Sequence, residues 1–191
     1  DSVAATHDEV LRQRAALRRA IQWIGQRHFE QELAVINLSE LVEHFASTLE
    51  PKLTELECGA RLEVSIASRS LMIHGSASGL LQVLTELVDN ATYALENDAV
   101  KDGVIGLSLS ESDVGGVVLK LRDNGRGVSE AHRHTIFEPF FTTKDHLGHL
   151  GLGLTRSRDL IRAMSGQITV NTALTAPGFE VVIEFPMALI S

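Results

Sequence analysis

The spacing of apolar residues changes along this chain from a helical period to a strand period. From Asp8 to Glu50, glycine and proline are scarce and apolar residues recur at helical spacing. Val10, Leu17 and Ile24 follow one another at intervals of seven residues. This interval predicts a long helix packed against another helix, although an amphipathic helix that covers its own domain has the same spacing.

A polar stretch interrupts this helical region. Asn37, Ser39 and Glu40 are typical of a capped helix start, so we expect a second helix to begin there. We therefore place a domain boundary at this point. Residues 1–36 are predicted to be one helical segment, and residues 37–191 are predicted to be a separate folded unit.

Six short segments further along alternate between apolar and polar residues, which is typical of strands. In chain order they form three pairs: Leu62 to Ile66 with Leu71 to His74, Val104 to Ser110 with Val117 to Arg122, and Gln167 to Thr172 with Phe179 to Phe185. We expect helices at Ala77 to Leu95, just after Ser129, and at Thr155 to Met164. The pattern predicts an α+β two-layer sandwich, in which helices cover one face of one mixed, mostly antiparallel sheet, preceded by the long N-terminal helix.

Composition and charge narrow the possible functions. The chain has 191 residues and a formal net charge of −8. Such a chain lacks the basic face that binds nucleic acid, so any phosphate ligand must be bound locally. No apolar run approaches the roughly 20 residues that cross a bilayer. We therefore expect no nucleic acid partner, no membrane contact by this segment and a cytoplasmic location, with any membrane anchor outside the segment.

A row of polar side chains runs along the predicted helix from Ala77. Gln82, Glu86 and Asn90 recur every four residues and therefore share one face, with Asp89 beside them. The opposite, apolar face consists of Leu80, Leu84, Leu87, Val88, Ala91 and Leu95. Carboxylate and amide oxygens in line can hold Mg²⁺ together with several waters, whereas a solvated polar face is the simpler reading of one helix taken alone.

Two glycine motifs point to a nucleotide. Asp123 to Gly127 follows an apolar strand, and its glycines would let a flat ligand lie against the backbone while Asp123 accepts a hydrogen bond from an amino group. Taken alone, the motif is equally an ordinary turn. Gly148 to Thr155 is a glycine-rich loop that leads into a helix, whose first amides attract phosphate. Its spacing matches neither the dinucleotide fingerprint nor the P-loop.

An aromatic cluster with two hydroxyls and a cation lies between the glycine motifs. It runs from Ile136 to Lys144 and contains Phe140, Thr142 and Thr143. The phenylalanines would pin a loop in any fold. The short polar stretch from Lys144 to Gly148, placed between two nucleotide-like turns, favours a phosphate lid.

In this order the motifs resemble those of the histidine kinase catalytic domain in the GHKL superfamily, which also holds gyrase-type and MutL-type ATPases. Glu86 to Ala91 is similar to the N box, Asp123 to Gly127 to the G1 box, Phe137 to Thr143 to the F box, and Gly151 to Thr155 to the G2 box. The resemblance extends over Asn37 to Pro186. Residues 1–36 resemble part of the second helix of a dimerisation hairpin.

The resemblance implies a role for each matching residue. Asp123 would bind the adenine amino group, Gly125 and Gly127 would let the base and the lid approach, and Phe140 would anchor the lid. Asn90 would ligate the Mg²⁺ that accompanies ATP, and Lys144 would compensate charge during phosphoryl transfer. The remaining residues of the phosphate side would be Thr142, Thr143, Gly148, Gly151, Leu152, Gly153 and Thr155.

Two positions depart from the family pattern. Many kinases of this class have asparagine in place of Glu86 and an aromatic residue in place of Ala94. Tyr93 lies one residue early for that aromatic role and is not assigned. In the ATPase branches a glutamate at the place of Glu86 activates water, so here it would either serve hydrolysis or help to orient or deprotonate an attacking histidine.

Three functions follow from this pattern. The first is a sensor histidine kinase module of a two-component system, which would transfer the γ-phosphoryl group of Mg-ATP to a histidine and then pass it to the receiver domain of a response regulator. The second is an ATP-hydrolysing enzyme that uses Glu86 as base, and the third is a non-catalytic nucleotide-binding regulator.

The acceptor histidine is expected outside this chain. His7 is followed by acidic residues, as an acceptor should be, but too few residues separate it from Asn37 for the rest of one helix, a turn and a second helix. The stripe from Val10 to Ile24 is a possible homodimer contact.

Overall fold

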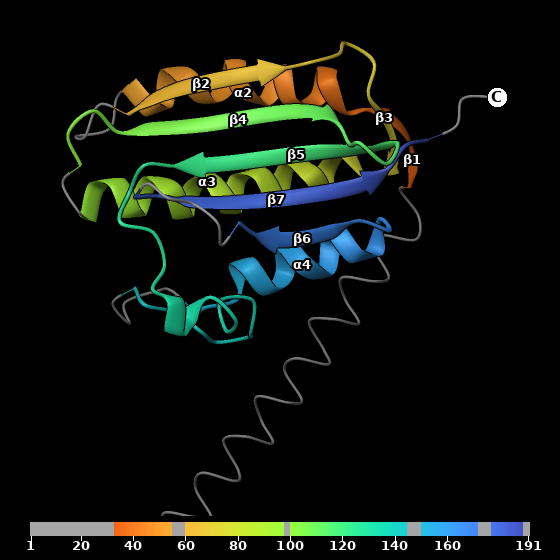
Figure 1. The fold of residues 1–191 in the computed structure, drawn as a ribbon. Coiled ribbons are helices and arrows are strands. Elements are labelled where there is room, and N and C mark those ends of the chain that lie inside the picture. Colours follow the sequence, from red (N-terminus) through yellow and green to blue (C-terminus); the bar gives the residue numbers. More distant parts are fainter. Residues whose placement is uncertain (1–32, 55–59, 98–99, 145–149, 172–176, 189–191) are drawn as a thin grey trace, which may run out of the picture.

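The computed structural model describes residues 33–54, 60–97, 100–144, 150–171 and 177–188. The predicted N-terminal helix, with its heptad stripe and His7, falls in residues 1–32 and lies outside the described residues. Within the described part, strands form one broad sheet and three α-helices lie behind it in Figure 1.

The main sheet has five strands in the order β2-β4-β5-β7-β6. Their bounds are β2 Arg61–Ile66, β4 Val104–Glu111, β5 Gly116–Asp123, β6 Gln167–Val170 and β7 Phe179–Pro186. Only β2 and β4 run parallel, and the other neighbours are antiparallel. The predicted mixed, mostly antiparallel sheet is therefore confirmed, with Asp123 at the end of its central strand.

The first predicted strand pair is wrong. β3, Met72–Gly75, does not join β2 but forms a separate two-stranded sheet with β1, Ala34–Asn37. The sequence pattern assigned the β1 residues to a helix. Ile36 of β1 lies opposite Ile73 of β3, and Ile73 is fully buried. Pairing with β3 across this apolar contact outweighs local helical spacing, which is weak evidence for so short a segment.

The second helix, α2, spans Leu38–Thr54 and begins where the polar stretch predicted. The side chain of Asn37 accepts a hydrogen bond from the Ser39 amide at 3.1 Å and donates one to Glu40 at 2.9 Å. The Ser39 hydroxyl donates to the Ser68 carbonyl at 2.7 Å. These bonds satisfy groups at the helix start and tie α2 to the loop between β2 and β3.

Helix α3, Ala77–Asn97, forms the centre of the helical layer. Its predicted apolar face is confirmed, because Leu80, Leu84, Leu87, Val88, Ala91 and Leu95 are all buried. They pack in one core cluster with the inward side chains of the sheet, including Leu107, Leu119 and Val181. Burial of this face leaves the polar face of α3 directed away from the sheet.

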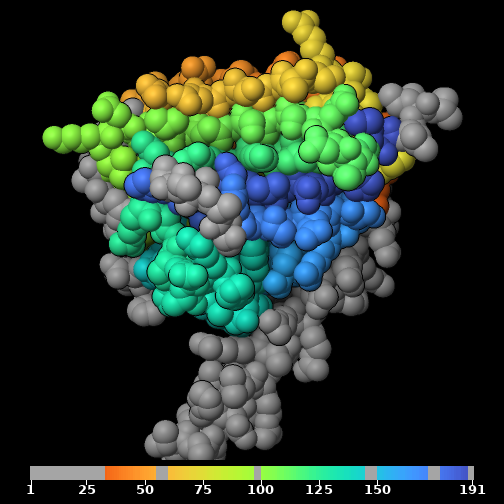
Figure 2. All heavy atoms as spheres, viewed as in Figure 1, coloured from red at the N-terminus to blue at the C-terminus, as the bar shows by residue number. Residues whose placement is uncertain are grey.

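Helix α4, Gly153–Ala163, lies beside α3 and completes the helical layer in Figure 1. The helix expected after Ser129 is a short 3₁₀ turn, Glu130–His132. Figure 2 shows strands β2, β4, β7 and β6 at the surface of the opposite side of the sheet. No helix in the described residues is long and apolar enough to cross a membrane.

Candidate nucleotide site

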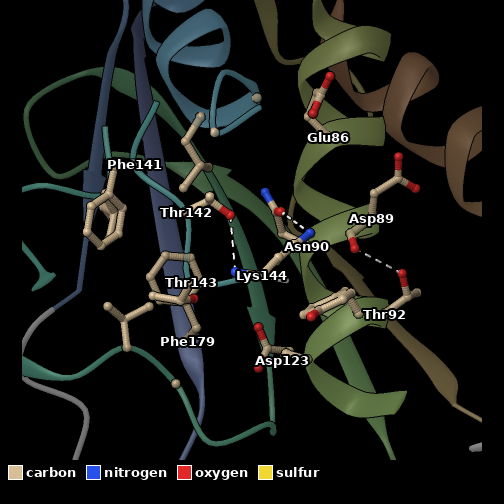
Figure 3. Close-up of a pocket in the computed structure, with 18 of the residues that line it drawn as sticks. Glu86, Asp89, Asn90, Thr92, Asp123, Phe141, Thr142, Thr143, Lys144 and Phe179 are labelled. Carbon is tan, nitrogen blue, oxygen red and sulfur yellow. Dashed lines mark hydrogen bonds between the residues drawn. The ribbon is translucent and has the colours of Figure 1, made fainter. Parts of the chain in front are cut away.

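A cavity of about 630 Å³ opens between the polar face of α3, the start of α4 and the chain that follows β5. In Figure 3, Glu86 and Asn90 point into it from α3, Thr142 and Thr143 face them from the opposite wall, and Asp123 lies at the other end. Residues of both glycine motifs therefore line one cavity. Glu86, Asp89 and Asn90 on the polar face of α3 line the same cavity.

The polar residues of α3 face two elements, helix α4 and the segment that ends at Lys144. With its oxygen directed toward α4, the Gln82 amide accepts hydrogen bonds from the Arg156 guanidinium at 2.9 Å. One turn on, Glu86 lies against the start of α4, and one further turn on, Asn90 meets Lys144. Because of the four-residue spacing, one face of α3 contacts both α4 and Lys144.

Asp123 forms the buried end of the cavity, with only 3% of its surface exposed. Its Oδ1 accepts a hydrogen bond from the Gly125 amide at 2.9 Å. Next to it, the Asn124 side chain accepts from the Val104 amide at 2.7 Å and donates to the Asp102 carbonyl at 3.0 Å. These bonds fix the turn after β5, so the carboxylate is held in place before any ligand arrives.

Two glycines in the motifs have backbone angles that favour glycine. Gly127 has φ +74, and a Cβ there would collide with the Gly178 carbonyl. Gly151 has φ +63, and a Cβ there would collide with the Phe141 carbonyl. In addition, the Phe140 amide donates a hydrogen bond to the Gly151 carbonyl at 2.9 Å. Glycine at residue 151 therefore lets the aromatic segment and the start of α4 pack together.

The start of α4 offers the anion-binding groups of the cavity. Gly153 is the first helical residue, and its neighbour Leu152 makes no side-chain capping bond. The Glu86 carboxylate approaches so closely that a Cβ on Gly153 would collide with Oε2. Amides at a helix start carry a partial positive charge, which stabilises a carboxylate or a phosphate in the same place.

Lys144 reaches across the cavity to α3. Its Nζ donates a hydrogen bond to Asn90 Oδ1 at 2.8 Å and lies 4.5 Å from the centre of the Tyr93 ring. Burial lowers the pKa of this ammonium below its ordinary value, while the nearby carboxylates of Asp89 and Glu86 act in the opposite direction. The lysine is therefore held by an amide oxygen, an aromatic face and two negative charges.

Most of the predicted site residues line this cavity. They are Glu86, Asn90, Asp123, Gly127, Thr142, Thr143, Lys144, Gly151, Leu152 and Gly153. Three others support it without being among its lining residues: Gly125, through its bond to Asp123; Phe140, through Gly151; and Thr155, whose hydroxyl donates to the Phe137 carbonyl at 3.0 Å. Gly148 lies outside the described residues.

Sequence reasoning missed several lining residues. Tyr93 was seen but left without a role, and Phe141, rather than Phe140, is the aromatic residue of that segment in the cavity wall. Phe179 and Arg126 also line the cavity. Phe179 begins β7 and pairs with Asp123 across the sheet, a placement that depends on strand order and has no local signal.

The donors beside Lys144 suit a hard divalent cation. Glu86, Asp89 and Asn90 supply carboxylate and amide oxygens, which are the ligands that Mg²⁺ prefers. Within the described residues no group of three or more His, Cys, Asp or Glu side chains could hold a metal without help. A site of this kind fits Mg²⁺ that is bound mainly through phosphate oxygens and water.

A comparison with protein families matches residues 75–189 to the histidine kinase-, DNA gyrase B- and HSP90-like ATPases. The match covers α3, the cavity and more than half of the chain. The chain belongs to this family. The resemblance inferred from the four boxes is thereby confirmed.

Individual relatives within the family are sensor kinases. The two-component sensor PprA of Pseudomonas aeruginosa is 35% identical over 136 residues, which is 70% of this chain and 14% of that protein. Full-length ShkA in complex with AMPPNP matches with a TM-score of 0.68 and 28% identity, over 83% of this chain and 32% of that one. The catalytic domain of histidine kinase ThkA matches with a TM-score of 0.69 and 26% identity, over 82% of this chain and 97% of that one. This chain spans 14% to 23% of the length of three curated relatives named as sensor proteins.

Proposed function

We propose that this domain binds Mg-ATP and transfers its γ-phosphoryl group to a histidine, as the catalytic module of a sensor histidine kinase. The observation that carries the proposal is the single cavity that joins Asp123 at one end to Glu86, Asn90 and the start of α4 at the other. One end offers a buried acceptor for an amino group, and the other offers amides and oxygen donors for phosphate and a cation.

The adenine would bind at the Asp123 end. The carboxylate would accept a hydrogen bond from the amino group of the base, and the rings of Phe179 and Tyr93 supply apolar walls. ShkA, which has this fold, was crystallised in complex with AMPPNP, and this supports nucleotide binding by the domain.

The phosphates would bind between the start of α4 and Lys144. Bound Mg²⁺ would neutralise charge on the phosphate oxygens. Asn90, with Asp89 beside it, would hold the cation, while Lys144 and the amides from Gly151 onward would hold and orient the phosphate chain. This arrangement positions the γ-phosphoryl group and compensates its charge, and these two effects account for most catalysis of phosphoryl transfer.

The acceptor histidine and the receiver domain are proposed partners from outside the described residues. Histidine kinase ThkA has been crystallised with the response regulator protein TrrA, and the kinase in that complex has the fold described above, with a TM-score of 0.65. A homodimer through residues 1–32, and a location in the cytoplasm beside any membrane anchor, belong to the same proposal.

Hydrolysis is a second candidate function because Glu86 lies in the cavity beside the start of α4. A carboxylate there is within the region where a water would attack a terminal phosphate. A regulator that binds nucleotide without reaction would use the same cavity.

One experiment separates the three functions. The domain is incubated with γ-labelled ATP, Mg²⁺ and a hairpin fragment that carries the acceptor histidine. A kinase gives an acid-labile phosphoprotein, whereas hydrolysis gives steady phosphate release that Glu86→Gln abolishes. A regulator binds ATP and gives neither product, and failure to bind ATP would refute all three.

A further inference from the structure

The Lys144 ammonium lies where the proposed metal ligand Asn90 offers its oxygen. Nζ and Oδ1 are 2.8 Å apart, and the Tyr93 ring, one helical turn along α3, stabilises the same ammonium. An ammonium and a divalent cation repel each other strongly at such short range. Lys144 must therefore leave Asn90 before a metal ion can bind to this oxygen.

The Glu86 carboxylate occupies the corresponding position for the phosphates. Its Oε2 lies against Gly153, at the start of α4, with the approach so close that a Cβ there would collide with it. The residues on either side of Gly153 in the cavity wall are Leu152 and Leu154, which carry no charge. A phosphate bound to the same amides would face this charge directly unless a cation lay between them.

We propose that, in the nucleotide-free domain, Lys144 holds the position of the divalent cation and Glu86 holds the position of the phosphate. Mg-nucleotide then enters by exchange: the cation displaces Lys144 from Asn90, the phosphates displace Glu86 from the start of α4, and Lys144 is released to contact the phosphates. This inference rests on the proposed function and assigns to Glu86 a second role, that of discriminating against nucleotide without metal.

Before the exchange, both of these partly buried charges lie beside groups that stabilise them. Lys144 is held between the Asn90 oxygen and the Tyr93 ring, and the Glu86 carboxylate lies against Gly153 at a helix start, where the partial positive charge favours an anion. The same contacts compete with Mg-nucleotide for Asn90 and for the start of α4. Metal-free nucleotide would bring its phosphates toward the Glu86 carboxylate without the charge of a divalent cation between them.

The lysine half of the proposal is tested with Mn²⁺ as a probe, measured by electron paramagnetic resonance without nucleotide. Lys144→Met removes the ammonium with little change in shape, and we expect Mn²⁺ to bind roughly fivefold or more tightly than to the original domain. The gain should vanish when Asn90→Ala is added. Lys120→Met, an exposed site on the sheet, controls for net charge. No gain, a gain that survives Asn90→Ala, or an equal gain in the control would overturn this half.

The glutamate half is tested by calorimetry of ADP binding in EDTA and in excess Mg²⁺. Glu86→Gln should tighten ADP binding in EDTA on the order of tenfold and change binding in Mg²⁺ much less. Glu43→Gln removes an exposed charge from α2, outside the cavity, and it should change neither value. Unchanged or weaker binding by Glu86→Gln in EDTA, or an equal gain in Glu43→Gln, would refute the role of Glu86.

The original domain serves as the reference that separates the two proposals. If it fails to bind ADP even in Mg²⁺, the proposed nucleotide site is wrong. If it binds Mg-ADP and the variants do not shift as described, the site stands and the exchange is wrong. Thermal unfolding of each variant shows that the measured protein is folded.

Discussion

Replacing Asp123 by asparagine changes one atom at the buried end of the cavity and leaves the shape of the side chain intact. The structure indicates which interaction is kept. Asp123 Oδ1 accepts the Gly125 amide at 2.9 Å, and an asparagine can present its own Oδ1 to the same amide. The turn after β5 should therefore survive, also because Asn124 ties it independently to β4. The other carboxylate oxygen of Asp123 becomes an NH₂ group, so a hydrogen-bond donor would face the adenine amino group, which is also a donor.

The magnitude follows from that mismatch. A hydrogen bond to a charged group contributes about 1.5–3 kcal/mol, and this carboxylate is only 3% exposed, so water cannot replace the lost partner well. We expect the dissociation constant of Mg-ADP to rise roughly 10- to 150-fold. Stability should fall by less than about 1 kcal/mol, since the Gly125 amide keeps its acceptor.

Isothermal calorimetry of Mg-ADP, with thermal unfolding as the measure of folding, tests this expectation. Asp113→Asn, in the exposed turn between β4 and β5, is the matched control and should bind as the original domain does. Guanine carries an oxygen where adenine carries its amino group, so Asp123→Asn should also narrow the preference for ADP over GDP. An affinity for Mg-ADP within twofold of the original would refute the assignment of Asp123 to the base.

Three further changes test the supports of the site. Gly151→Ala places a side chain at φ +63 against the Phe141 carbonyl, so it should lower the free energy of unfolding by about 1–3 kcal/mol and weaken Mg-ADP binding. Thermal unfolding measures the first effect and calorimetry the second. If neither changes, the close packing of Gly151 against Phe141 is wrong. Thr155→Val leaves the Phe137 carbonyl without its 3.0 Å hydrogen bond and should lower the free energy of unfolding, measured in urea, by about 1–3 kcal/mol. A loss below a few tenths of a kcal/mol would mean that this hydrogen bond does not stabilise the fold. Leu84→Ala empties a fully buried core position and should cost about 2–5 kcal/mol in the same assay, so a smaller loss would mean that this face is not core.

Local patterns predicted much of the helical layer. The apolar face of α3 repeats at helical spacing from Leu80 to Leu95, and such a pattern has one physical solution, burial against the sheet. The start of α2 was equally readable because the cap of Asn37 involves neighbours in sequence. The boundary between residues 36 and 37, by contrast, stays a prediction, and residues 34–36 form a strand in the structure.

Non-local pairing decided what the patterns could not. β3 follows β2 closely, yet it pairs with β1, and β2 pairs in parallel with β4. Strand alternation predicts that a segment is extended but does not specify its neighbour, because the choice depends on which apolar faces must be covered. The wrong first strand pair is a consequence of that limit.

The sequence by itself determined which side chains the site offers, and from them it predicted the chemistry that we propose: an acidic residue and glycines for a base, a glycine-rich helix start for phosphate, and Asn90 on a polar helix face for a cation. This was possible because each motif consists of residues close together in the sequence, and few structures other than a nucleotide site need all of these motifs in one chain. The tertiary structure alone decided that Phe179 lies opposite Asp123, that Lys144 reaches Asn90 beside Tyr93, and that Glu86 rests on the start of α4. These contacts join residues far apart in the chain, and only the packing of sheet, helices and loop brings their charges within bonding distance.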